Sequence, residues 1–99
     1  MPTIESLSAL DGAPHANVFP TSEPKTIRLT LSAGEEVASH AHPERTIVMY
    51  VIEGAIELTL GDEVYELSAG EIAHFDGDQD ISPRALDESQ ALIVLARRG

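Results

Sequence analysis

Two histidines, His40 and His42, stand one residue apart in the stretch His-Ala-His-Pro-Glu. Side chains at i and i+2 of an extended strand point to the same face, so we expect both imidazoles to face one way. Neutral imidazole is the commonest metal ligand in proteins, and two of them supply half of a coordination sphere. The pair therefore predicts a divalent-metal site. The alternative is a hydrogen-bonded, metal-free pair at the mouth of a pocket.

Further ligands are needed, because sites for zinc, iron, nickel or manganese generally use three or four protein ligands. Glu44 is one candidate, since the chain turns at Pro43 and could bring this carboxylate back. The alternative for Glu44 is a solvated loop acid beside Arg45. His74 is a second candidate, either as a third imidazole or as a proton-transfer group. The alternative for His74 is a half-buried side chain with one hydrogen bond.

The elements that must position these residues show a hydrophobic period of two, as in Ile27, Leu29 and Leu31. Short segments of this kind alternate with glycine turns, and no segment has a helical period, which is typical of an all-β sandwich or barrel. Strands are expected at residues 26–31, 37–42, 46–53, 55–60, 63–67, 72–75, after Ile81 with a disturbance at Pro83, and at 91–96. Residues 1–25 are expected to form an irregular arm that packs on or extends a barrel of residues 26–99. His15, which lies among turn-forming residues in that arm, is expected to be solvated.

The net charge of the chain disfavours some classes of binding partner. The 99 residues, enough for one domain, include 17 acidic and 6 basic side chains, for a net charge of −11. Such a chain repels phosphate backbones and anionic membranes, so nucleic-acid and membrane binding are disfavoured. The excess of acids with a single lysine favours a salt-adapted, halophilic source, because salt screens the self-repulsion. An ordinary acidic protein is the alternative.

No cysteine is present, so neither disulfides nor thiolate chemistry is expected. The sequence has no signal-peptide pattern and no apolar run near the roughly 20 residues of a membrane span. We therefore expect a soluble, cytoplasmic protein.

The spacing of Gly34, His40, His42 and Gly54 resembles the first motif of the cupin superfamily. Tyr50-Val51-Ile52-Glu53-Gly54 looks like the strand end of that motif, and Ser68-Ala69-Gly70-Glu71 resembles the start of the second motif. The likeness covers about residues 26 to 96. It implies a double-stranded β-helix, or jelly-roll barrel, that is commonly a homodimer and has a pocket inside the barrel.

Two of the four ligands that the resemblance implies are absent. The metal-binding glutamate of the family falls at Thr46 or Ile47, and the histidine of the second motif falls at Ile81. Ile47, Ile81 and Tyr50 are instead expected to line the pocket. We therefore expect a small-molecule pocket with a weak or altered metal site at His40 and His42. The alternative is a metal-dependent oxygenase or isomerase using those residues with Glu44 or His74.

Overall fold

The computed structural model describes residues 2–98 and confirms the all-β prediction. Its elements in chain order are η1 (Leu7–Ala9), β1 (His15–Asn17), β2 (Lys25–Leu31), β3 (Arg45–Glu53), β4 (Ala55–Leu60), β5 (Glu63–Ser68), β6 (Ile72–Asp76), β7 (Ile81–Ala85) and β8 (Ser89–Arg97). Among the described residues, no helix has the length and apolar character needed to cross a membrane.

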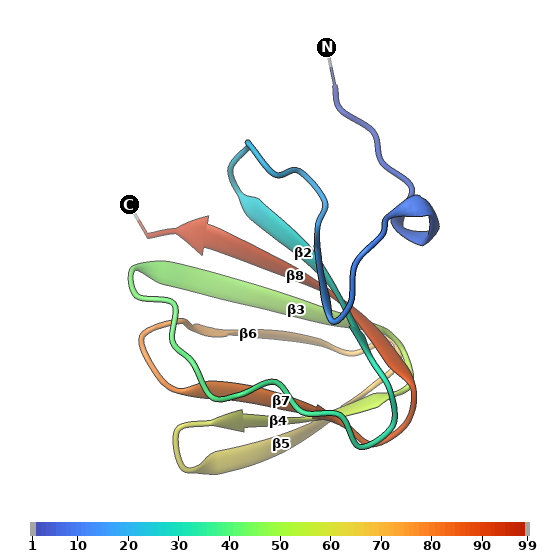
Figure 1. Cartoon of the computed structure of the whole chain (residues 1–99). Coiled ribbons are helices and arrows are strands. Elements are labelled where there is room, and N and C mark those ends of the chain that lie inside the picture. Colours follow the sequence, from blue (N-terminus) through green and yellow to red (C-terminus); the bar gives the residue numbers. More distant parts are fainter. Residues whose placement is uncertain (1, 99) are drawn as a thin grey trace.

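The strands form two antiparallel sheets that face each other (Figure 1). The larger sheet has five strands in the order β1-β2-β8-β3-β6, and the smaller has three in the order β5-β4-β7. Strands that are distant in the chain are therefore neighbours, since β8 lies between β2 and β3. This crossing of connections between two sheets is the jelly-roll arrangement expected from the sequence.

The core lies between the inner faces of the two sheets. Alternate residues of each strand point inward, so Leu29 of β2, Met49 of β3 and Leu58 of β4 are fully buried. Gly54 allows the turn from the large sheet to the small one, because its φ is +81° and an added Cβ would lie 2.3 Å from the Glu88 carbonyl. The buried side chains are almost all aliphatic, as the composition indicates.

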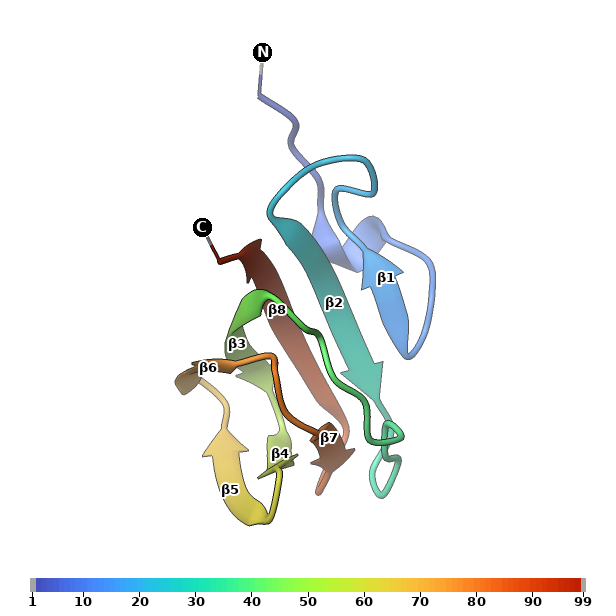
Figure 2. The same cartoon turned by 90° about the vertical axis from the view of Figure 1, so that its left-hand side faces the viewer.

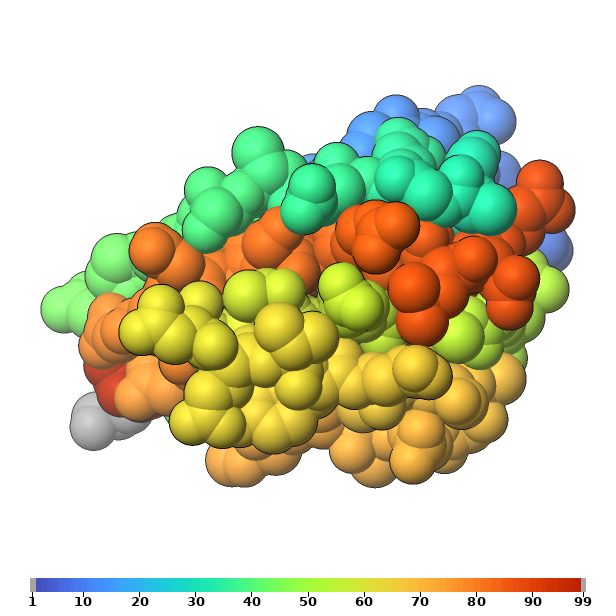
Figure 3. Space-filling model, turned by 90° about the horizontal axis from the view of Figure 1, so that it is seen from below, coloured from blue at the N-terminus to red at the C-terminus, as the bar shows by residue number. Residues whose placement is uncertain are grey.

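The expected strand at residues 37–42 does not form. This segment runs beside β7 but makes only isolated bridges, Glu36 to Arg84 and His40 to Ile81. Pro83 has no backbone N–H, so β7 cannot complete the ladder, and the Val37 carbonyl instead accepts the Ser82 hydroxyl at 2.8 Å. Figure 3 shows the segment (teal to green) beside β7 (orange) at the border of the smaller sheet.

The N-terminal arm reaches the larger sheet. β1 pairs with β2, with His15 opposite Leu29, and Figure 2 shows it at the edge of that sheet. The buried Arg28 of β2 donates hydrogen bonds to the carbonyls of Leu7 and Gly12, the second at 3.0 Å. These bonds fix the arm against the outer face of the sheet.

Candidate functional site

A cavity of about 110 Å³ lies between the two sheets and is lined by three histidines, His15, His40 and His42. The rest of its wall is apolar and comes from both sheets: Ile27, Leu29, Ile47, Met49, Leu58, Phe75, Ile81, Pro83, Ile93 and Leu95. An apolar pocket with a few convergent polar groups is the usual form of a small-molecule site.

His40 and His42 line the same cavity although their segment is not a regular strand. Their ring centroids are 4.7 Å apart and the rings meet edge to face. The His40 Nδ1 lies 2.9 Å from the Ala38 carbonyl, which can only accept, so Nδ1 carries the proton in the neutral ring. The Nε2 of a neutral His40 is therefore a free acceptor.

Gly77 holds the backbone of His42 in place. The His42 N–H donates to the Gly77 carbonyl at 2.8 Å, and the Gly77 N–H donates to the Arg45 carbonyl at 2.9 Å. An added Cβ at Gly77 would lie 2.3 Å from the His42 carbonyl oxygen, so only glycine allows this close approach.

Burial and neighbouring positive charge favour the neutral form of two of the imidazoles. The pKa of His42 is lowered mainly by burial and then by His40, Lys25, Arg45 and His15. The pKa of His15 is likewise lowered by burial, then by His40 and Lys25. Both effects disfavour the charged imidazolium.

His15 is the member of the site that its sequence context did not indicate. It is exposed, as expected, but the pairing of β1 with β2 also brings it to the cavity wall. A histidine between turn-forming residues has no signal for this role, because only the long-range pairing of the arm places it there.

The donor set does not fit a firmly held metal. Among residues 2–98, no three His, Cys, Asp or Glu side chains are grouped closely enough to hold a metal ion. The three imidazoles share a cavity wall but do not converge on one point. His40 and His42 alone leave a transition metal short of the three or four ligands it generally takes.

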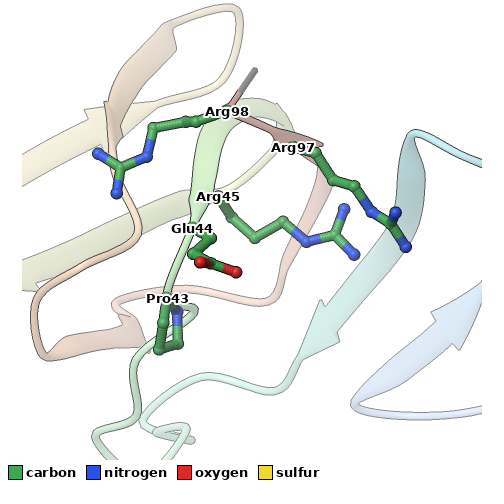
Figure 4. A pocket seen from close by; sticks show the side chains of 5 residues that line it. All are labelled: Pro43, Glu44, Arg45, Arg97 and Arg98. Carbon is green, nitrogen blue, oxygen red and sulfur yellow. The ribbon is translucent and has the colours of Figure 1, made fainter.

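Glu44 lies in a different hollow. It is exposed, with a φ of +64°, and lines a surface hollow of about 600 Å³ with Pro43, Arg45, Arg97 and Arg98. In Figure 4 the guanidinium groups of Arg45 and Arg97 extend to one side of the hollow and that of Arg98 extends to the other.

The charges of that hollow are already paired. Arg45 binds Glu23 at 2.6 Å, and Arg97 lies 3.7 Å from the same carboxylate. Arg98 binds Asp76 at 2.9 Å and also contacts Asp78. The hollow therefore presents little uncompensated positive charge.

The remaining predicted site residues divide between the inside and the outside of the sandwich. Ile47 and Ile81 line the histidine cavity. His74 is exposed and lines a separate hollow of about 290 Å³ with Tyr65. Tyr50 is 39% exposed on the outer face of β3, between the inward-facing Met49 and Val51.

A family model described as a cupin domain matches residues 27–96 of the chain. No curated protein matches the chain. Solved structures with the same fold are numerous, and three illustrate the range.

An RmlC-like cupin from Desulfovibrio desulfuricans is 25% identical, with 97% of this chain and 96% of that chain covered and a TM-score of 0.76. A conserved protein with a double-stranded β-helix domain from Klebsiella pneumoniae is 22% identical, with coverage of 98% and 91% and a TM-score of 0.80. KdgF from a Halomonas species is 20% identical, with coverage of 89% and 84% and a TM-score of 0.72. The last two likenesses show the fold alone.

Proposed function

Because the chain belongs to the cupin family, we propose that it binds a small organic molecule in the cavity between its two sheets. The observation that carries this proposal is a largely apolar cavity wall that also includes three imidazoles. The apolar wall favours an apolar ligand body through the hydrophobic effect, and the imidazoles supply hydrogen bonds that orient a polar end.

A test uses a neutral probe and a variant that fills the cavity. 2-Methylpropan-1-ol has an apolar body and one hydroxyl, and we expect it to shift the methyl resonances of cavity residues with an affinity of roughly millimolar, about −4 kcal/mol. Ile93→Phe should abolish these shifts, because Ile93 lines the cavity and the larger ring takes up its space. Leu92→Phe, on the other face of β8, is the matched control. Equal binding by both variants, or no binding by the wild type, would contradict the proposal.

A weak divalent-metal site at His40 and His42 accompanies this proposal. Support comes from the free Nε2 of His40 and the lowered pKa of His42, because ligating imidazoles must be neutral. Zinc titrated by calorimetry should bind in the micromolar range or weaker, and His40→Ala with His42→Ala should remove it without unfolding the barrel. Unchanged zinc binding in the double variant would refute the assignment. An oxygenase or isomerase would need Glu44 or His74 beside this pair, and both line other hollows.

We also propose a homodimer that covers the outer face of the five-stranded sheet. Tyr50 lies opposite Leu92 and Ile72 in the register of that face, and Ile72 is 64% exposed. These neighbours are uncharged in a chain of net charge −11, so repulsion between two copies is smallest there. Sedimentation equilibrium should give a dimer that Tyr50→Glu dissociates and Tyr65→Glu, on β5, does not. A monomeric wild type would refute this proposal.

A further inference from the structure

We propose that the ligand of the cavity is a small monocarboxylate with a branched apolar body, whose carboxylate lies at the histidines beside Lys25. This inference rests on the proposed function, because it names the class of molecule that the same cavity takes. Three features carry it: the position of Lys25, the charges around the imidazoles, and the size of the apolar space.

Lys25 is a neighbour of lining residues of the cavity, both along β2 and across to β8. It is the first residue of β2, and alternate residues of this strand share a face, so Lys25 lies on the same face as Ile27 and Leu29. Both of these line the cavity. Lys25 is also paired in register with Leu95 of β8, another lining residue. Lys25 is an exposed residue, and among the described residues it makes no ion pair.

The surroundings of the imidazoles are cationic in a strongly acidic protein. Besides the other imidazoles, the charges that lower the pKa of His15 and His42 come from Lys25 and, for His42, from Arg45. No carboxylate of residues 2–98 forms an ion pair with either ring. Glu23 approaches this edge, but it is bound by Arg45 at 2.6 Å. With 17 acidic side chains in the sequence, a cavity mouth bordered by positive groups favours an anion over a neutral or cationic ligand.

Three of the polar side chains at or beside the cavity can donate hydrogen bonds to a ligand, and the fourth can only accept one. His15 and His42 each carry at least one N–H that can donate, in the neutral or the charged form, and Lys25 can donate from its ammonium group. His40 uses its Nδ1 proton on the Ala38 carbonyl and has only an acceptor left. A carboxylate needs donors only, so we assign its partners as His15, His42 and Lys25.

The apolar space limits the size of the ligand body. A cavity of about 150 Å³ accommodates benzene, with its six carbons, so about 110 Å³ corresponds to roughly four carbons. The compact wall of Leu, Ile and Met side chains suits a branched aliphatic group. 3-Methylbutanoate has such a body, and 3-methylbutanamide has the same shape without the charge.

The test compares these two probes by calorimetry at neutral pH on chelator-treated protein. We expect 3-methylbutanoate to bind about tenfold more tightly than the amide, because charge-assisted hydrogen bonds are roughly twice as strong as neutral ones. Lys25→Gln should reduce the preference to about threefold or less, and Lys25→Arg should retain most of it. Arg84→Gln is the control: it changes the net charge by the same amount as Lys25→Gln, but on the outer face of β7. This variant should prefer the carboxylate over the amide as strongly as the wild type does.

Distinct results overturn the inference and the proposed function. If the amide binds as tightly as the carboxylate, the cavity binds small molecules but the inference is wrong. An undiminished preference in Lys25→Gln, or carboxylate binding that appears only after zinc is added, overturns it as well. If neither probe binds and the alcohol probe also fails, the proposed function itself is wrong.

Discussion

The histidine cavity and the arginine hollow at the start of β3 differ in size, polarity and state of charge. The hollow is the larger, about 600 Å³ against about 110 Å³, and three arginines line it. Its guanidinium groups are paired with Glu23, Asp76 and Asp78, whereas the imidazoles of the cavity have no carboxylate partner within the described chain. Exposed ion pairs of this kind contribute little to the free energy of unfolding, and they leave no guanidinium charge unpaired for a ligand. The better candidate for a binding site is therefore the histidine cavity, in which the imidazoles have no carboxylate partner among the described residues and the rest of the wall is apolar.

The largest expected effect comes from Gly77→Ala, which attacks the cavity through the backbone of His42. The new Cβ would meet the His42 carbonyl at 2.3 Å, so the segment must move, at a cost of about 1–3 kcal/mol in the free energy of unfolding. We also expect loss of 2-methylpropan-1-ol binding, measured by methyl NMR.

Gly61→Ala is the control for that substitution. Its Cβ has open space, and the strain of its φ of +61° costs about 1–2 kcal/mol by itself. It should leave probe binding intact. If Gly77→Ala binds the probe as the wild type does, the placement of His42 does not matter for the cavity.

The imidazoles predict a pH dependence of stability. The pKa values of His15 and His42 are lowered from 6.5, so the unfolded chain binds more protons in the window between each lowered pKa and 6.5. Their contribution to stability is complete above that window and is lost as the pH falls through it. The groups facing them are His40, Lys25 and Arg45, all of which favour the neutral form.

Chemical denaturation at neutral and mildly acidic pH, in the presence of chelator, measures this effect. The free energy of unfolding should fall on acidification, and His15→Asn combined with His42→Asn should reduce the slope. An equal slope in the double variant would show that the cavity histidines are not responsible.

Salt acts on the molecule as a whole. The net charge of −11 destabilises the folded chain by self-repulsion, and molar potassium chloride screens this repulsion. We expect the melting temperature to rise by a few degrees, which corresponds to about 1 kcal/mol in the free energy of unfolding. Salt also weakens the attraction within the ion pairs of the arginine hollow, but this effect is smaller. A flat or falling melting temperature would argue against adaptation to salt.

The smallest effect is expected in the arginine hollow. Arg98→Gln removes the exposed pairs to Asp76 and Asp78, and such pairs are worth about 0.2–1 kcal/mol. The affinity for 3-methylbutanoate should stay unchanged in calorimetry, because Arg98 does not line the cavity. A large loss of affinity would shift the site towards the hollow.

Much of the fold follows from the sequence because the hydrophobic period of two and the glycine turns set strand positions locally. The structure places β4 at Ala55–Leu60 as expected, and the other predicted strands that form differ by one or two residues at their ends. β1 (His15–Asn17) lies in the arm that was expected to be irregular. Residues 37–42 fail as a strand because Pro83 of the neighbouring strand lacks the N–H that the ladder requires. That cause lies on another segment, so local alternation cannot reveal it.

The site was predictable only in part. The His-x-His spacing indicated that His40 and His42 share a face, and both line the cavity, as do Ile47 and Ile81. Tyr50 lies in an unbroken apolar run, which has no alternation to show which residues face inward, and it faces outward. His15 reaches the cavity, and Lys25 comes beside the lining residue Leu95, only through the pairing of β2 with β1 and β8, which is tertiary information.

The most direct test of the central claim, that the cavity rather than the arginine hollow binds the ligand, is methyl and amide NMR of the protein titrated with 3-methylbutanoate. The account predicts shifts at the methyl groups of Met49, Ile81 and Leu95, with the amides of Arg97 and Arg98 unchanged. Shifts confined to those arginines, with the cavity methyl groups unmoved, would contradict it.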